Sequence, residues 1–93
     1  MNDIKARREE ILRICESHGG HNVRVFGSVA RGEETTQSDI DILLEFEKGR
    51  SLFDQIGLID DLTEFFHQKV DVVSEPALNR HIREQVLKEA VAI

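Results

Sequence analysis

The chain has 93 residues, a net charge of −6 and an apolar share of 40%. This length suits one small domain, so we expect residues 1–93 to form a single folded unit. The negative charge and the lack of Trp and Tyr argue against direct nucleic-acid binding, which needs a basic surface. The single Cys excludes an internal disulfide, and no apolar run approaches ~18 residues, so we expect a cytoplasmic protein with no membrane span.

The predicted elements alternate between helices and short strands. In chain order we expect a helix over 2–17, a strand over 23–26, a turn at 27–28 leading into a short helix, a loop over 33–38, a strand over 39–46, a helix over 52–66, a strand over 70–73, a helix over 78–89 and a short strand over 90–93. This order, roughly αβαβαβα, predicts an α/β (α+β) fold in which a small mixed β-sheet packs against helices on one side.

Caps and apolar spacing define the two long helices. Asn2 is placed to cap the first and Ser51 the second. Cys15 lies on the apolar stripe of the first helix and is expected in the core. Gly57 costs the second helix about 1 kcal/mol relative to Ala, which suggests that close packing requires it. The residues expected to face inward from that helix are Leu52, Ile56, Ile59, Leu62 and Phe66.

The strand over 39–46 carries the most informative pattern. Successive side chains of a strand alternate between faces, so Asp39 and Asp41 point the same way. Asp71, between two valines of a later strand, should face the same side. If the two strands are neighbours, three carboxylates meet on one open face of the sheet. The opposite face receives Ile40, Ile42, Leu44 and Phe46.

A cluster of carboxylates needs cations to offset its repulsion. Mg²⁺ suits these oxygen ligands and often keeps water and substrate phosphates in its shell. Two such ions about 3.5–4 Å apart would orient an in-line attack on phosphorus and stabilise the leaving pyrophosphate. In this arrangement Asp39 and Asp41 bridge both ions, and Asp71 contacts one.

The Gly27-Ser28 turn supplies a candidate phosphate site. Glycine lets the backbone approach a phosphate closely, and the Ser28 hydroxyl and amide can donate hydrogen bonds to it. A short helix starting at Val29 would add a further preference for an anion. The turn is not a Walker loop, because the GxxxxGK[ST] pattern is absent.

Two further residues have alternative roles. Arg31 could reach the triphosphate, or it could form an ion pair with Glu33 or Glu34. Ser38 could bind a phosphate or orient Asp39, or it could serve only as a turn or capping residue. The sequence leaves both pairs of alternatives open.

In combination, these pieces resemble the signature of the DNA-polymerase-β-like nucleotidyltransferases. The pieces are Gly-Ser-x-Ala-Arg-Gly at 27–32, Ser-Asp-Ile-Asp at 38–41 and Val-Asp-Val-Val at 70–73. Within that group the chain looks most like the minimal nucleotidyltransferase (MNT) proteins, and the match covers essentially its whole length. The resemblance implies the nucleotidyltransferase fold, ATP as substrate and Mg²⁺ held by Asp39, Asp41 and Asp71.

The resemblance also implies a biological role. MNT proteins are commonly paired with a small helical HEPN protein, an RNase toxin, in toxin–antitoxin modules. We therefore expect an antitoxin that transfers AMP from ATP to a hydroxyl of the toxin, a tyrosine hydroxyl by analogy. Two alternatives stay open: a non-catalytic antitoxin that masks the toxin, and nucleotide transfer to a small molecule or tRNA.

Overall fold

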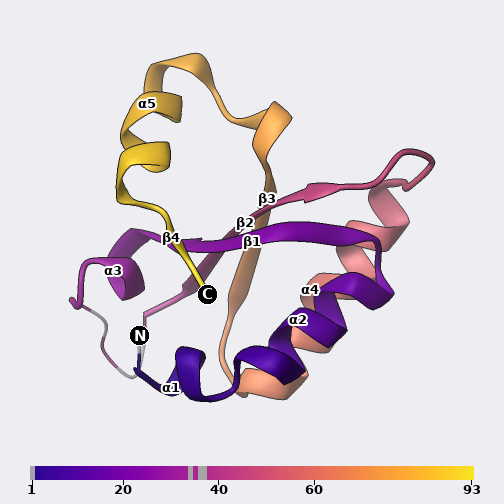
Figure 1. The fold of residues 1–93 in the computed structure, drawn as a ribbon, viewed down its shortest axis with the longest axis horizontal. Coiled ribbons are helices and arrows are strands. Elements are labelled where there is room, and N and C mark those ends of the chain that lie inside the picture. The colour runs from indigo at the N-terminus through magenta and orange to yellow at the C-terminus, as the bar shows by residue number, and fades with distance from the viewer. Residues whose placement is uncertain (1, 34, 36–37) are drawn as a thin grey trace.

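The chain folds around a four-stranded mixed sheet with strand order β3-β2-β1-β4 (Figure 1). The computed structural model describes residues 2–33, 35 and 38–93. β1 runs antiparallel to β2 and to β4, whereas β2 and β3 are parallel. The strands are β1 (Gly20–Phe26), β2 (Ile40–Phe46), β3 (Val70–Ser74) and β4 (Val91–Ala92). The mixed sheet and the alternating element order confirm the α+β prediction.

Five α-helices and one 3₁₀ helix in the described part of the chain surround this sheet. α2 and α4 lie side by side beneath one face (Figure 1). The helices are α1 (Asn2–Ala6), α2 (Arg8–Ser17), α3 (Gly27–Ala30), α4 (Leu52–Phe66) and α5 (Arg80–Glu89), and the 3₁₀ helix is η1 (Glu75–Ala77).

The face toward α2 and α4 forms the core. The alternation predicted for β2 is confirmed, because Ile40, Ile42 and Leu44 are all buried. Cys15 is also fully buried, and its thiol pKa is raised to about 12 mainly by that burial. The rest of this cluster comes from Ile4, Ile11, Val23, Val25, Val29, Leu58, Leu62, Val70 and Val72.

The opposite face of the sheet is partly covered as well. Leu43 on that face is fully buried, and Arg24 forms a 2.6 Å ion pair with Glu75 of η1. The expectation of helices on one side is therefore wrong for the last helix. The reason is topological: β3 and β4 lie at opposite edges of the sheet, so the chain between them must cross a face.

The first predicted helix is broken in two at Arg7. This residue leaves the helical region (φ −108°, ψ 20°), and its guanidinium carbon lies 3.8 Å from the centroid of the Phe65 ring. A cation–π contact of about 0.5–1 kcal/mol gives the break a physical reason. α1 begins at Asn2 itself, and the proposed capping side chain lies outside the described residues.

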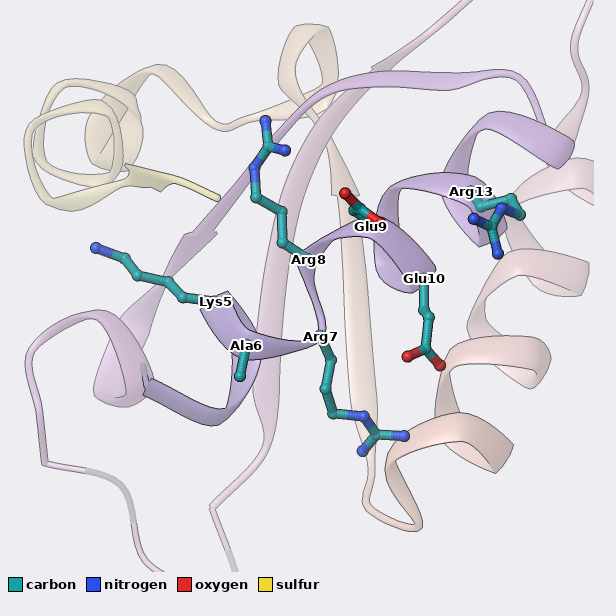
Figure 2. Close-up of a pocket in the computed structure, with 7 residues that line it drawn as sticks. All are labelled: Lys5, Ala6, Arg7, Arg8, Glu9, Glu10 and Arg13. Carbon is teal, nitrogen blue, oxygen red and sulfur yellow. The ribbon is translucent and has the colours of Figure 1, made fainter.

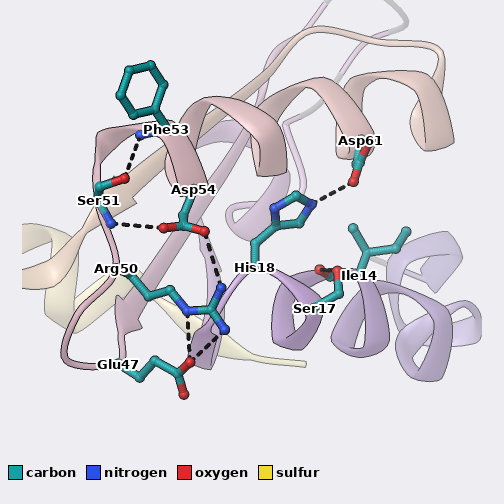
Figure 3. A network of polar contacts seen from close by, with 9 residues as sticks. All are labelled: Ile14, Ser17, His18, Glu47, Arg50, Ser51, Phe53, Asp54 and Asp61. Carbon is teal, nitrogen blue, oxygen red and sulfur yellow. Dashed lines mark hydrogen bonds and ion pairs between the residues drawn. The ribbon is translucent and has the colours of Figure 1, made fainter.

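The start of α4 is fixed by a capping box that the sequence predicted in part. Ser51 accepts a hydrogen bond from the Phe53 amide, and Asp54 accepts one from the Ser51 amide (Figure 3). The expected inward stripe is confirmed for Leu62, which is fully buried, and for Ile59 and Phe66, which pack against the core, but it is wrong for its first two residues. Leu52 is 68% exposed and Ile56 is 47% exposed.

Leu58 and Leu62 are the residues of α4 that are fully buried. The helix carries more apolar residues than one face can bury, and contact with β3 and α2 buries Leu58 in place of Leu52 and Ile56. Gly57 meets the expectation of close packing, because a Cβ there would lie 3.0 Å from Cε1 of His18. His18 in turn forms a 2.6 Å contact with Asp61 (Figure 3).

Candidate functional site

The sheet places Asp41 and Asp71 directly beside each other. They are paired in the parallel register of β2 and β3, one strand spacing apart, which is about 4.8 Å in a sheet. Asp39, just before β2, is 40% exposed and lies 3.6 Å from the Lys69 ammonium. Two of the three expected acids therefore meet as neighbours, while Asp39 lies at the rim with a cationic partner.

Gly27 packs directly against the Asp41 carboxylate. It follows Phe26, which is paired with Asp41 across β1 and β2. Its φ of +74° is in the left-handed region, and a Cβ at this position would lie 2.2 Å from Oδ2 of Asp41. Glycine is thus required twice, by the backbone conformation and by the approach of the carboxylate. Helix α3 begins at Gly27, so Ser28 lies in its first turn.

Negative charge accumulates around Asp41. Burial raises the pKa of Asp41 above its usual range, and repulsion from Asp71 and Asp39 raises it further. Arg31 opposes this rise. Such a site gains from an added cation. Within residues 2–33, 35 and 38–93, however, no three Asp, Glu, His or Cys side chains are already arranged as a metal site.

Arg31 forms ion pairs with two carboxylates. Its Nε lies 3.2 Å from Glu33, and its Nη1 lies 2.9 Å from Oε1 of Glu89. Glu34, the other expected partner, lies outside the described residues. Ser38 lies in a turn, where its hydroxyl accepts a 2.8 Å hydrogen bond from the Thr35 amide.

Glu89 is the residue of this region that sequence reasoning missed. Its Oε1 accepts a 2.7 Å hydrogen bond from the Gly27 amide as well as the contact from Arg31. One local signal could have identified it. An acidic side chain in the last turn of a helix is disfavoured by the helix dipole, so it needs compensation from another part of the chain.

A groove of about 530 Å³ opens beside the two paired acids. It is lined by Asp41 and Asp71, and most of its other lining residues are apolar, among them Ile59, Leu78 and Ile82. The remaining lining residues are Phe26, Val72, Val73, Ala77 and Asn79.

A second hollow lies at the junction of α1 and α2 (Figure 2). Figure 2 shows Arg7 pointing away from Lys5 and Arg8, in keeping with its contact with Phe65. Both basic and acidic side chains line it: Lys5, Arg7, Arg8, Glu9, Glu10 and Arg13. This mixture of charges defines no selective site.

A four-stranded mixed sheet that carries neighbouring acids beside a Gly-Ser turn is the arrangement expected of a nucleotidyltransferase. The sequence profile of the nucleotidyltransferase domain family matches residues 8–93. The chain therefore belongs to this family, and it is a nucleotidyltransferase enzyme of the minimal type.

Known relatives agree with this assignment. The chain is 38% identical to a Methanocaldococcus jannaschii protein provisionally named a protein adenylyltransferase, over all of this chain and 97% of that one. It is also 38% identical to the protein adenylyltransferase MntA of Thermococcus cleftensis, over 91% of this chain and 94% of MntA.

Solved structures share the fold. One provisionally assigned as a minimal nucleotidyltransferase is 48% identical and superposes with a TM-score of 0.88 over 99% of this chain and 94% of that one. A toxin–antitoxin structure with AMP-PNP superposes with a TM-score of 0.78 at 20% identity, over 90% of this chain and 69% of that chain, which shows likeness of fold alone. Across the described residues, every helix falls short of the length and apolar character that crossing a bilayer demands.

Proposed function

We propose that this chain, as one minimal nucleotidyltransferase domain over residues 1–93, transfers AMP from ATP to a hydroxyl of a partner protein in a Mg²⁺-dependent reaction. The proposed partner is a HEPN RNase toxin, the proposed acceptor is a tyrosine, and the chain acts as its antitoxin in the cytoplasm. The observation that carries the proposal is the pairing of Asp41 with Asp71 beside the Gly27-Ser28 turn.

The carboxylates fit Mg²⁺ by their chemistry. They offer hard oxygen donors, and burial and neighbouring acids already raise the pKa of Asp41, so a cation would relieve a real excess of negative charge. Asp41 and Asp71 would hold the metal from the sheet. Asp39 would become a further ligand once its ion pair with Lys69 breaks. When bound, Mg²⁺ would neutralise phosphate charge and make a nearby hydroxyl more acidic.

The residues at and after the Gly27-Ser28 turn would bind the triphosphate. The Ser28 hydroxyl and amide would donate to the phosphates, and Arg31 would orient them. The acceptor oxygen bonds to the α-phosphorus, the bond from that phosphorus to the pyrophosphate oxygen breaks, and pyrophosphate leaves with the electron pair. The hydroxyl proton passes to a carboxylate of the cluster, for which Asp71 is our candidate.

The groove supports a protein acceptor. The apolar side chains that line it suit an aromatic ring, and Asp41 and Asp71 line the same groove, so they would lie near a hydroxyl carried at the end of that ring. A net charge of −6 disfavours tRNA as the acceptor. The relatives that are 38% identical carry names of protein adenylyltransferases, which points the same way.

The test is an intact-mass spectrum of a HEPN protein encoded beside this chain, taken after incubation with the chain, ATP and Mg²⁺. We expect a mass increase of one or more AMP groups, and no increase with the D39A/D41A variant. Transfer by that variant would refute the mechanism. A stable complex without any mass change would favour the non-catalytic antitoxin, and label on tRNA or a small molecule would favour the other alternative.

A further inference from the structure

Glu89 lies at the end of α5, yet it reaches into the turn that begins α3. A single oxygen, Oε1, accepts a hydrogen bond from the Gly27 amide at 2.7 Å and another from Arg31 Nη1 at 2.9 Å. Gly27 is the first residue of α3 and Arg31 is the residue that ends it. Glu89 therefore holds both ends of the short helix that contains Ser28.

The backbone fixes this position. β4 is antiparallel to β1, with Val91 opposite Val25 and Ala92 opposite Arg24. Continuing that register by two residues puts Glu89 opposite Gly27. The pairing of the two strands thus brings the backbone of Glu89 close to Gly27, and the length of its side chain lets Oε1 reach both donors.

Three features of its surroundings disfavour a negative charge on Glu89. The side chain is only 19% exposed, it ends a helix whose C-terminus already carries partial negative charge, and it adds to the repulsion around Asp41. A Gln would avoid these costs and still accept hydrogen bonds. The two donated hydrogen bonds are charge-assisted, which offsets part of the penalty and gives the group a fixed geometry.

We propose that Glu89 is a positioning residue of the nucleotidyl transfer site: it sets the orientation of Arg31 and of the Gly27-Ser28 turn toward the phosphates of the nucleotide. The inference rests on the proposed function, because it takes these residues to bind the triphosphate. It adds a distant part of the chain to that site, and it gives the α5–β4 segment a role in binding the nucleotide.

The test is to measure Mg²⁺-dependent binding of AMP-PNP by calorimetry. The full chain is compared with variants that separate the length of the Glu89 side chain from its charge. E89D keeps the charge but shortens the side chain, so it cannot hold both donors, and we expect at least tenfold weaker binding. E89Q keeps the length and the accepting oxygen, so it should retain most of the affinity. The matched control is E84Q on the same helix, where the side chain is 84% exposed and no change is expected.

A second comparison separates positioning from a merely structural role. If Glu89 acts largely through Arg31, E89D should cost less than threefold in an R31A background. A full tenfold loss in that background would overturn the role assigned to Arg31, and equal binding by E89D and the unchanged chain would overturn the whole proposal. Tighter binding by E89Q would show instead that the carboxylate repels the triphosphate. Failure of the unchanged chain to bind AMP-PNP would overturn the proposed function together with this inference.

Discussion

Replacing Gly27 by Ala tests the contact on which the site depends. A residue with a Cβ in the left-handed region costs roughly 1–2 kcal/mol. The added Cβ would also lie 2.2 Å from Oδ2 of Asp41, whereas Cβ contacts below 3.0 Å essentially never occur. The carboxylate or the turn must therefore move by about 0.8 Å, the difference between these two distances. A misplacement near 1 Å can lower a reaction rate by about 100-fold.

Gly49 provides the matched control for this change. Its φ is +89°, a Cβ there meets nothing within 4 Å, and it follows the end of β2 that is remote from Asp41. G49A should thus lose about 1–2 kcal/mol of unfolding free energy in urea and keep its rate of AMP transfer. G27A should lose at least as much stability and about 100-fold in transfer rate. Equal transfer rates for G27A and G49A would refute the claim that Gly27 sets the position of Asp41.

Three further predictions concern the site and the fold. Burial and neighbouring acids raise the pKa of Asp41 in the folded chain. The protonated carboxyl therefore supports the folded state at low pH, and this contribution to the unfolding free energy is lost as the pH rises through the raised pKa. Without Mg²⁺, D41N should therefore have a higher unfolding free energy in urea than the unchanged chain, and the difference should grow from acid to neutral pH. A difference that shrank over this range would contradict the raised pKa of Asp41. L58A should lower the unfolding free energy by about 2–5 kcal/mol, and I56A by no more than about 0.5 kcal/mol. Equal losses in these two variants would contradict the orientation of α4. S51A should cost about 0.5–2 kcal/mol through the lost cap, measured by urea unfolding, and an unchanged midpoint would show that Asp54 suffices alone.

The elements that could be predicted from the sequence are those with a strong local signal. The alternation from Ile40 to Leu44 predicted both β2 and the face that carries Asp41, and Ser51 predicted the start of α4. The pairing of Asp41 with Asp71 needed one more assumption, that their strands are neighbours, and the sheet meets it.

The features that were missed depend on contacts between distant parts of the chain. The break at Arg7 accompanies a contact with Phe65, which has no local counterpart in the sequence. The stripe on α4 was correct for Leu62 but wrong for Leu52 and Ile56, because the helix has more apolar residues than one face can bury and only packing selects Leu58. Glu89 lies 62 residues from Gly27, and only the register of β4 against β1 brings the two together.

The shared register of β2 and β3 makes the spacing of Asp41 and Asp71 depend on the hydrophobic core. The same backbone that carries Asp41 and Asp71 on one face buries Ile42 and Val72 on the other. A slip of one residue would turn both acids inward, so core packing keeps them in place. The groove beside the two acids is also lined by Ile59 of α4, Ala77 of η1 and Ile82 of α5, which lie outside this paired unit. Substitutions in those segments could therefore change the shape of the groove, and with it the proposed choice of acceptor, while the spacing of the two carboxylates stays constant.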